Sequence, residues 1–399
     1  MQKLKVLFVL TPALHPNQGG VQMSTCKLGR WFSNLGHEVG VFSFACDGHA
    51  PVDFGKLWTS VVEGGQGEAA NRDALGKVLE AFSPDVVINQ MPYERGIGNF
   101  LKQRKKYLLL GCLRNTLFSV KGNLATYVQR TAPRFLRPFS GSAILQHLFL
   151  VMHRYRHRRE LAWILDTYDL FVMFGPPNLD ELEYFLPDFD QDRIRLIPNS
   201  IPAILEGVPA KERRLLWLGR VSREQKQAEL ILPVWSKVSQ ALPDWRLDVV
   251  GDGPLLPELK KRAATEGLPR IEFHGRQVSD DFYRRSSIFF MTSAFEGFPN
   301  TLVEAQSYGT IPVVFNSYPV AGWIVENGRS GLLIPPFDVE GMANRIVALA
   351  KDPARGYQAE CVLESAHRFH INRVGAMWQA LFEAEVPRHV GSVPTGDLG

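Results

Sequence analysis

The sequence predicts an α/β protein with two doubly wound parallel-sheet domains that face each other across a cleft. Short apolar runs alternate with amphipathic helical segments along both halves of the chain, which is typical of parallel strands covered by helices on both faces. The 399 residues suffice for two domains of ordinary size, each with its own core. Proline-rich sequence near the middle separates the two halves.

The strands are expected in continuous apolar runs. In the first half these runs occupy residues 5–10, 38–44, 84–90, 107–113 and 169–175. In the second half they occupy residues 214–220, 246–253, 271–275, 287–293, 310–315 and 331–335. Two open parallel sheets that face each other place a ligand cleft at the carboxyl ends of their strands.

The boundary between the domains is expected within 196–213, where three prolines and a glycine break any periodic pattern. We therefore assign residues 1–200 to a first domain and residues 201–371 to a second. Residues 372–399 remain. Their amphipathic first part, as far as Val386, is expected to cross back over the interdomain groove as a helix, and the rest to form a loose tail.

Composition favours a soluble globular protein of the cytosol. Hydrophobic residues make up 45% of the chain and charged residues 22%. The four cysteines show neither close pairing nor zinc-site spacing, as expected for reduced thiols. The apolar run 5–10 stops at Thr11 and Pro12, so we interpret it as a first strand and not as a signal peptide. No apolar run approaches the roughly 20 residues of a membrane span.

The net charge of +4 conceals a strongly basic region at about 101–160. From Lys102 to Arg159 there are thirteen lysines and arginines and no acidic residue. Large apolar residues alternate with cations in 134–139 and 148–159. This composition favours an amphipathic surface that lies on anionic lipid headgroups, at about 1 kcal/mol for each well-placed cation. A solvated basic face is an alternative, and nucleic-acid binding is another, although no recognition motif accompanies the charge.

The stretch SAFEGFPNTLVEAQSYG (293–309) is the most informative part of the sequence. It predicts a loop that turns into a short helix, with Asn300 as the N-cap and Gly309 as the left-handed stop. A helix start offers free N–H groups to a diphosphate or a sugar oxygen. The carboxylates of Glu296 and Glu304 are placed to accept hydrogen bonds from hydroxyls on the two halves of a nucleotide sugar. The alternative is a solvated pair of surface glutamates.

Other segments also have features of phosphate binding. Gly19 and Gly20 lie between the first strand and a helix, where the backbone can approach an anion closely. Arg220 ends a strand and Lys226 is expected to begin the next helix, so both could reach one diphosphate, each contact contributing about 1.5–3 kcal/mol. The glycines of 249–254 lack the third glycine of a dinucleotide fingerprint and are interpreted as turn residues.

Taken together, these segments resemble a retaining glycosyltransferase of family 4, of the kind that builds bacterial cell-surface polysaccharide or lipopolysaccharide. Such enzymes have the GT-B fold of two Rossmann-like domains. The resemblance covers nearly the whole chain, is strong from about Leu215 to Pro335 and is loose in the first half. It rests on GGV (19–21), GRVSREQK (219–226), VVGDGPLLPELKK (249–261), FHGRQ (273–277) and FEGFPNTLVEAQSYGTIPVV (295–314).

The resemblance implies a role for each matching residue of the second, donor-binding domain. Glu304 is implied to bind the ribose hydroxyls of the donor, and Glu296 a hydroxyl of the sugar. Arg220 and Lys226 are implied to neutralise the departing nucleoside diphosphate. Five further residues are implied to surround the sugar and phosphates with backbone: Gly297, Phe298, Pro299, Asn300 and Thr301.

Further assignments concern the base and the first, acceptor-side domain. Gly19 and Gly20 match the glycine loop that approaches the diphosphate from the first domain. Arg276 and Val278 fall near the part of such enzymes that holds the base.

One departure from the family concerns a strand end of the first domain. Members often have a His near the sugar in a segment like 112–119, whereas this chain has Arg114 followed by Asn115. An arginine stays protonated and cannot act as a general base, although it can hold an acceptor phosphate or an oxygen of the leaving group. Glu94, after the run 84–90, is expected to be a substitute polar group in the cleft or, equally, a carboxylate that caps a helix.

The resemblance implies retaining transfer of a hexosyl unit from a nucleotide sugar, with a UDP-sugar favoured, to a lipid-linked or oligosaccharide acceptor. We expect the enzyme to act on the inner face of the plasma membrane and to have no nucleic-acid partner. We also expect no metal, because Arg220 and Lys226 take the place of a divalent ion. The alternatives are a nucleotide-sugar epimerase of GT-B fold, a soluble saccharide-forming transferase, and a lipid-surface scaffold with an inactive donor site. A GT-A enzyme with manganese on Asp188 and Asp190 is the least favoured.

Overall fold

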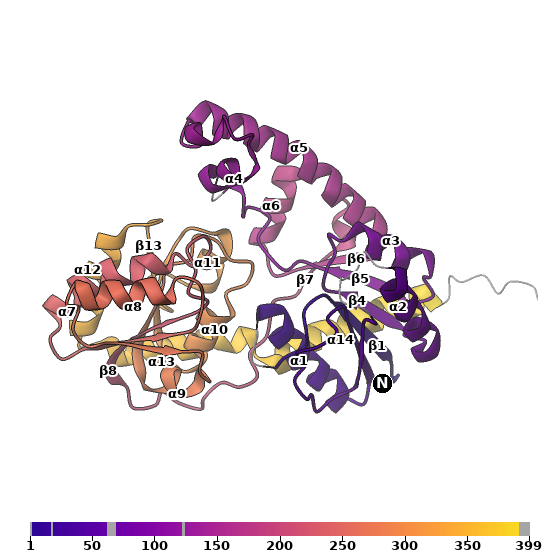
Figure 1. The fold of residues 1–399 in the computed structure, drawn as a ribbon. Coiled ribbons are helices and arrows are strands. Elements are labelled where there is room, and N and C mark those ends of the chain that lie inside the picture. The colour runs from indigo at the N-terminus through magenta and orange to yellow at the C-terminus, as the bar shows by residue number, and fades with distance from the viewer. Residues whose placement is uncertain (1, 17–18, 62–68, 122–123, 391–399) are drawn as a thin grey trace, which may run out of the picture.

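The structure, a computed structural model of the chain, describes residues 2–16, 19–61, 69–121 and 124–390. The molecule has two lobes, and each lobe is built around one β-sheet (Figure 1). Within the described part of the chain, no helix has the length and the apolar character needed to cross a membrane.

Both sheets are entirely parallel, as predicted. The first contains β1 (Lys5–Leu10), β2 (Glu38–Ser43), β3 (Lys56–Thr59), β4 (Val86–Asn89), β5 (Leu108–Cys112), β6 (Leu170–Met173) and β7 (Ile194–Leu196). The second contains β8 (Glu212–Leu218), β9 (Arg246–Val250), β10 (Ile271–Gly275), β11 (Ser286–Met291), β12 (Ile311–Phe315) and β13 (Leu332–Ile334).

Each sheet reverses its strand order at one place. The orders are β3-β2-β1-β4-β5-β6-β7 and β10-β9-β8-β11-β12-β13, so the reversals lie between β1 and β4 and between β8 and β11. At such a reversal the carboxyl ends of neighbouring strands lead into helices on opposite faces, which leaves a crevice for a ligand.

Most of the strands that the sequence predicts are buried on both faces, and the edge strand β10, also predicted, is only partly buried. Leu7 and Val9 of β1 belong to one apolar core, whereas Val6, Phe8 and Leu10 belong to the core on the other face. This alternation follows from the two-residue period of a strand. β3 and β7 were not predicted. They are edge strands of only four and three residues, most of them not fully buried, so they give no clear apolar run.

The helices of the first lobe are α1 (Gly20–Asn34), α2 (Ala69–Phe82), α3 (Arg95–Gln103), α4 (Leu124–Thr131), α5 (Ala143–Thr167) and α6 (Pro177–Phe185). Those of the second are α7 (Ile231–Ala241), α8 (Leu256–Thr265), α9 (Asp280–Arg285), α10 (Asn300–Ser307), α11 (Pro319–Ile324), α12 (Val339–Lys351) and α13 (Arg355–Ala366). Short 3₁₀ turns connect several of these elements.

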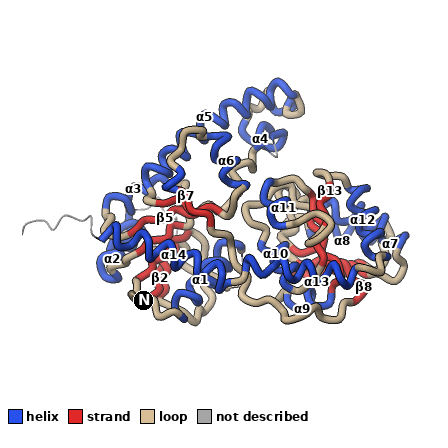
Figure 2. Tube along the Cα trace, turned by 180° about the vertical axis from the view of Figure 1, so that it is seen from behind, coloured by secondary structure: helices blue, strands red, loops and turns tan. Residues whose placement is uncertain are grey.

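The last helix, α14 (Ile371–Val390), returns from the second lobe to the first, as predicted. Figure 2, seen from behind, shows it running from α13 across the first lobe beside α1. Trp378 and Phe382 of α14 pack on Phe32 of α1, with ring centroids 6.4 and 5.3 Å from that of Phe32. The helix includes residues 388–390, which were expected in the loose tail, and residues 391–399 lie outside the described part of the chain.

The longest helix, α5, has 25 residues and carries much of the basic region. Its carboxyl-terminal part packs on the first lobe, with Leu161 and Ile164 fully buried. Its amino-terminal part, together with α4, projects away from both sheets (Figure 1).

Candidate functional site

The loop after β11 and the start of α10 form the centre of the candidate site. α10 begins at Asn300, and Pro299 occupies the N-cap position without a side-chain cap, so the prediction that Asn300 caps this helix is wrong. The Asn300 side chain instead accepts a hydrogen bond from Nδ2 of Asn199, at 3.1 Å. The predicted left-handed stop is confirmed, since Gly309 has a φ of 66°.

Two other residues of this loop have distinct surroundings. Phe298 is buried, and its ring lies 5.7 Å from that of Phe174 in the first domain and 5.4 Å from that of Phe369. The hydroxyl of Thr301 is buried and has no hydrogen-bond partner among the described residues. An unpaired buried hydroxyl costs free energy, so a ligand oxygen at this helix start would stabilise it.

Glu296 and Lys226 lie together, although seventy positions separate them in the sequence. Lys226 Nζ donates to one carboxylate oxygen of Glu296 at 2.6 Å, and Gln225 Nε2 donates to the other at 3.1 Å. The side chains of Glu296 and Lys226 are only 7% and 15% exposed. A pair this buried is stable only if both members stay in place, because each charge alone would lack a partner.

Two further hydrogen bonds hold the loop that carries Lys226. The hydroxyl of Thr292 donates to the carbonyl of Lys226 at 2.7 Å, and the N–H of Ala294 donates to the carbonyl of Gln225 at 2.8 Å. The prediction that Lys226 begins a helix is wrong. Lys226 precedes a left-handed residue, Gln227, with a φ of 44°, and the 3₁₀ turn Ala228–Leu230 that leads into α7.

Arg220 follows β8 at the carboxyl edge of the second sheet. Its side chain is exposed and makes no hydrogen bond or ion pair with any described residue. The neighbouring Gly219 lies against the stem of Lys226, since a Cβ on Gly219 would be 3.5 Å from Cε of Lys226. The two predicted cations therefore share one region, with Lys226 paired and Arg220 free.

Glu304, on α10, is bound by the first domain. Lys27 of α1 donates to Oε1 of Glu304 at 3.1 Å and to the carbonyl of Ser200 at 3.3 Å. The hydroxyl of Tyr283 donates to Oε2 at 3.3 Å, and burial together with this carboxylate holds the pKa of Tyr283 well above its usual range. Lys27 was not predicted. The only sign in the sequence is its position two helical turns after Gly20, on the same face of α1.

The glycine loop of the first domain also faces α10. Gly19 has a φ of 64° at the N-cap of α1, and a Cβ on Gly20 would come within 3.3 Å of Nδ2 of Asn300. Ser24 of α1 donates to Asn199 at 3.0 Å, and Asn199 in turn donates to Asn300. A chain of polar contacts therefore joins the starts of α1 and α10 across the interdomain boundary.

Gly297 approaches the backbone of the first domain closely. A Cβ on Gly297 would lie 2.7 Å from Cα of Asn115 and 3.0 Å from the carbonyl of Arg114, so no other residue fits there without displacing backbone. Arg114 has a buried Nε without a hydrogen-bond partner among the described residues. Burial lowers the pKa of its guanidinium, and the thiol of Cys112 beside it offsets part of this effect.

Glu181 on α6, which was not predicted, fixes the loop that contains Arg114. It is fully buried and accepts hydrogen bonds from the hydroxyl of Thr116, from the N–H of Leu117 at 2.9 Å and from Nδ2 of Asn178 at 3.2 Å. Burial raises the pKa of Glu181, while these hydrogen bonds lower it. An acidic residue near the start of a helix was the only sign of this role in the sequence.

Three predicted residues have no contact with this centre. Arg276 and Val278 follow the edge strand β10 and are exposed, Val278 by 72%. Glu94 occupies the N-cap position of α3, but its side chain is exposed and makes neither a capping bond nor any other hydrogen bond or ion pair with the described residues.

The pair Asp188 and Asp190 has the structural role of a turn. Asp190 accepts a hydrogen bond from the N–H of Asp192 at 3.0 Å and so caps a 3₁₀ turn before β7. Neither aspartate belongs to a cluster of potential metal ligands within the described residues.

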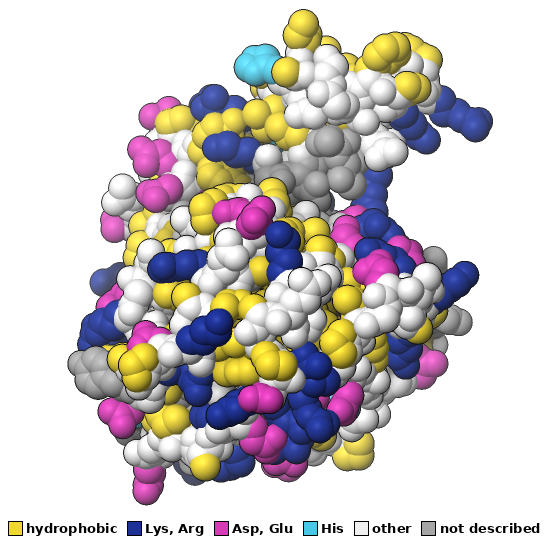
Figure 3. All heavy atoms as spheres, turned by 90° about the vertical axis from the view of Figure 1, so that its left-hand side faces the viewer, with side chains coloured by type: hydrophobic (Ala, Val, Ile, Leu, Met, Phe, Trp, Pro, Cys, Tyr) yellow, Lys and Arg dark blue, Asp and Glu magenta, His cyan; other side chains and the backbone are white. Residues whose placement is uncertain are grey.

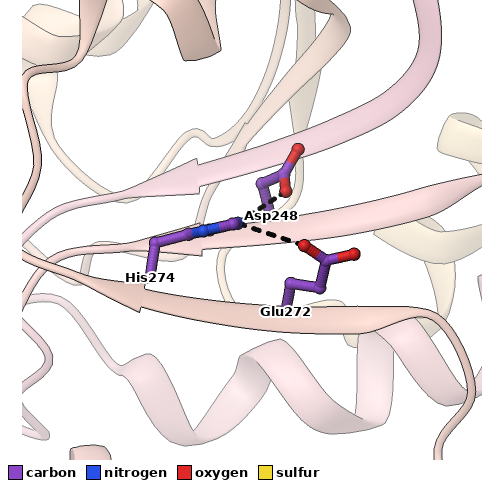
Figure 4. A group of neighbouring side chains, drawn as sticks. All are labelled: Asp248, Glu272 and His274. Atoms are coloured by element: carbon purple, nitrogen blue, oxygen red, sulfur yellow. Dashed lines mark hydrogen bonds and ion pairs between the residues drawn. The ribbon is translucent and has the colours of Figure 1, made fainter.

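One such cluster does exist, made of Asp248, Glu272 and His274 on β9 and β10 (Figure 4). His274 Nε2 lies 2.7 Å from Asp248. Arg214 of β8 donates to both oxygens of the same carboxylate, at 3.1 and 3.0 Å. The guanidinium already supplies the positive charge that a metal ion would bring, so this group ties three strands together.

Comparison with known proteins shows similarity in both sequence and fold. Residues 212–352 match the family of glycosyl transferases group 1. The chain is 29% identical over 201 residues to an exopolysaccharide phosphotransferase of Streptomyces coelicolor, covering 49% of this chain and 21% of that protein. It is 32% identical over 160 residues to an uncharacterized glycosyltransferase of Haemophilus influenzae, covering 40% and 44%. It is 32% identical over 122 residues to the amylovoran biosynthesis glycosyltransferase of Erwinia amylovora, covering 30% and 33%.

Solved structures resemble the chain over nearly its whole length. The apo form of the lipopolysaccharide outer core galactosyltransferase WaaB has a TM-score of 0.66 at 17% identity, covering 95% of this chain and 99% of that chain. HepE of Anabaena in complex with UDP-glucose has a TM-score of 0.69 at 17% identity, covering 95% and 100%. The predicted GT-B fold is confirmed, and the match to the group 1 glycosyl transferases lies within the second lobe. The chain matches less than half the length of the three curated relatives named above.

The buried pair of Lys226 and Glu296 can be tested through stability. Lys226→Met leaves the Glu296 carboxylate buried without its cation, so the free energy of unfolding should fall by about 3–5 kcal/mol. Lys226→Met combined with Glu296→Gln should recover most of that loss, because no uncompensated charge remains. Guanidinium denaturation followed by tryptophan fluorescence measures the free energy of unfolding of both variants.

The matched control is Lys237→Met, whose ion pair with Glu340 is exposed on both sides and should change the unfolding free energy by less than about 1 kcal/mol. A double variant at least as unstable as the Lys226→Met single variant would show that the pair is not coupled.

Proposed function

We propose that the protein is a retaining, metal-independent glycosyltransferase that moves a hexosyl unit from a nucleoside-diphosphate sugar to a saccharide acceptor. The observation that carries this proposal is the grouping of Lys226, Glu296 and Arg220 at the carboxyl ends of β8 and β11, where the strand order reverses. A UDP-sugar is the favoured donor, because a solved protein of the same fold holds UDP-glucose.

The diphosphate of the donor would lie between the start of α10 and the two cations. Breaking the bond between the sugar and the phosphate leaves negative charge on the diphosphate, and positive groups fixed beforehand stabilise it most effectively. Glu296 and the loop hydrogen bonds fix Lys226. Arg220 has no partner among the residues that the structure describes, so its side chain can turn towards the phosphate.

The two carboxylates would hold the two ends of the donor. A carboxylate has about four acceptor positions, and Glu296 uses two of them, for Lys226 and Gln225. It retains capacity for a sugar hydroxyl. Glu304 would accept from the ribose hydroxyls in the same way, beside its contacts with Lys27 and Tyr283.

The first domain would present the acceptor. The loop after β5 carries Arg114 and Asn115, and neither side chain takes up a proton. We therefore propose that the acceptor hydroxyl passes its proton to an oxygen of the departing diphosphate. In this step the bond from the anomeric carbon to the phosphate oxygen breaks, and a bond to the acceptor oxygen forms on the same face. The anomeric configuration is retained.

The acceptor is proposed to be a lipid-linked saccharide at the inner face of the plasma membrane, in cell-surface glycan synthesis. Bacterial polysaccharide and lipopolysaccharide transferases among the relatives support this assignment. A soluble saccharide-forming transferase would use the same donor site. A nucleotide-sugar epimerase would act on the donor alone, so incubation of the donor without acceptor separates it from a transferase.

Arg220→Ala should reduce transfer about 10²–10³-fold, because one preorganised donor to the developing charge is lost. The fold should be unaffected, since this side chain is exposed. The donor is first identified by a thermal-shift screen of nucleotide sugars, in which a ligand at 100 times its Kd adds about 2.7 kcal/mol of stability. Transfer and the anomeric configuration of the product are then followed by NMR.

The control is Arg213→Ala, an exposed arginine of β8 paired with Asp244, which should leave transfer unchanged. Turnover near that of the unaltered protein in Arg220→Ala, or a product of inverted configuration, would refute this part of the proposal.

Glu304→Ala should weaken nucleoside diphosphate binding by about ten- to a hundredfold, because the loss of one hydrogen bond to a charged group costs about 1.5–3 kcal/mol. Calorimetric titration with UDP measures the Kd. Glu340→Ala, an exposed glutamate of α12 with 71% side-chain exposure, is the control. An unchanged Kd in Glu304→Ala would remove Glu304 from the site.

The proposed reaction needs no divalent ion, because Arg220 and Lys226 supply the positive charge. Transfer should therefore continue at the same rate after dialysis against EDTA and in its presence. Rates with and without added manganese or magnesium provide the comparison. A strict requirement for manganese would contradict the proposed role of the two cations.

A further inference from the structure

One side of α5 is covered by neighbouring helices. Phe149 and His153 have their rings 6.4 and 5.4 Å from that of Tyr127 on α4. His153 and His157 have theirs 5.8 and 4.8 Å from that of Phe185 on α6. This inner side accounts for the packing of the helix.

The opposite side of α5 carries a second set of large apolar residues, which we call the outer stripe. Their exposed fractions are 85% for Ile144, 54% for Leu148, 51% for Val151, 50% for Met152 and 65% for Tyr155. Steps of three and four residues place all five along one face of a helix. Two more exposed aromatic residues, Phe135 and Phe139, precede the helix.

Cations border and extend the outer stripe. Arg158 and Arg159 follow Tyr155 by three and four residues and so lie on the same face, and Arg154 and Arg156 flank it. Arg156, Arg158 and Arg159 are exposed, and none of them forms a hydrogen bond or ion pair with a described residue. In Figure 3, hydrophobic and cationic side chains share the surface of the part that projects above the second domain.

We propose that the outer stripe of α5 and its bordering arginines dock on the surface of an anionic lipid bilayer. The apolar residues would enter the boundary between headgroups and acyl chains, and the arginines would contact lipid phosphates. Charge excludes the main competing occupant. A second copy of this chain, placed face to face, would bring unpaired arginines against unpaired arginines, since residues 102–159 contain no acid.

The position of this docking surface suits an enzyme whose acceptor is anchored in the same bilayer, and in this respect the inference rests on the proposed function. Arg130, at the end of α4, donates to Glu224 at 2.6 Å. Glu224 belongs to the loop between Arg220 and Lys226 in the second domain. Docking through α5 would therefore hold the donor loop near the headgroups, within reach of a lipid-linked saccharide.

Vesicle sedimentation of the full-length protein tests the proposal. The unaltered protein should sediment with vesicles of phosphatidylglycerol and phosphatidylcholine, less at high salt, and weakly with phosphatidylcholine alone. Leu148→Gln combined with Val151→Gln, and separately Arg158→Gln combined with Arg159→Gln, should each lower the partition coefficient about tenfold or more. Thermal melting should not change, since these side chains are exposed.

The controls are Val61→Gln, for an apolar residue with 67% exposure in the first domain, and Arg345→Gln, for an exposed arginine of α12. Both should leave the partition coefficient unchanged. Absence of vesicle binding by the unaltered protein, or full binding by both α5 variants, would overturn the proposal. A dimer in analytical ultracentrifugation that Leu148→Gln with Val151→Gln dissociates would overturn it too, and assign the stripe to a second copy.

Calorimetric titration with UDP separates the two hypotheses. The α5 variants should bind UDP as the unaltered protein does, because the substitutions lie outside the donor site. Vesicle binding without UDP binding would refute the proposed function and leave the docking surface standing. UDP binding without vesicle binding would refute the docking surface alone.

Discussion

The candidate site depends on one constraint, which is that the buried carboxylate of Glu296 needs a cation. Lys226 satisfies it at 2.6 Å, from a loop seventy positions earlier in the chain. Because neither charge is stable there alone, the pair fixes the loop after β8 against the loop after β11. The fixed position is the reversal of strand order in the second sheet, and the result is a positive charge held in place before any ligand arrives.

A second set of contacts joins the two domains at the site, so that residues of both domains form it. Lys27 of α1 reaches Glu304 of α10, Asn199 bonds to Asn300, and Gly297 meets the backbone of Asn115 without room for a side chain. α14 returns to pack on α1 and so ties the second domain to the same element that supplies Lys27. The groups proposed to bind the donor are therefore held in place by contacts from both domains.

The sequence predicted the parts of this arrangement that are encoded locally. Continuous apolar runs indicated the doubly buried strands, and Gly309 indicated the end of α10. The errors also have local causes, since Pro299 takes the N-cap position from Asn300. Local sequence patterns could not predict which residues would pair with the site residues, because the partners lie far away in the sequence. Lys27 lies 277 positions from Glu304, and the hydrogen bond that holds Leu117 on Glu181 joins residues 64 positions apart. Only the folded chain brings such residues together.

The arrangement of cations separates those with a structural role from those available to other molecules. Lys226 and Lys27 are largely buried and each is paired with a carboxylate, as is Arg214, which binds the fully buried Asp248. Arg220, Arg158 and Arg159 are exposed and have no such partner in the described part of the chain. A positive charge left unpaired beside groups positioned by the fold, or beside an uncovered apolar stripe, favours an anion from outside the protein. These cations thus mark the two places where we propose that this chain binds phosphate, one in the crevice between its domains and one on the outer side of α5.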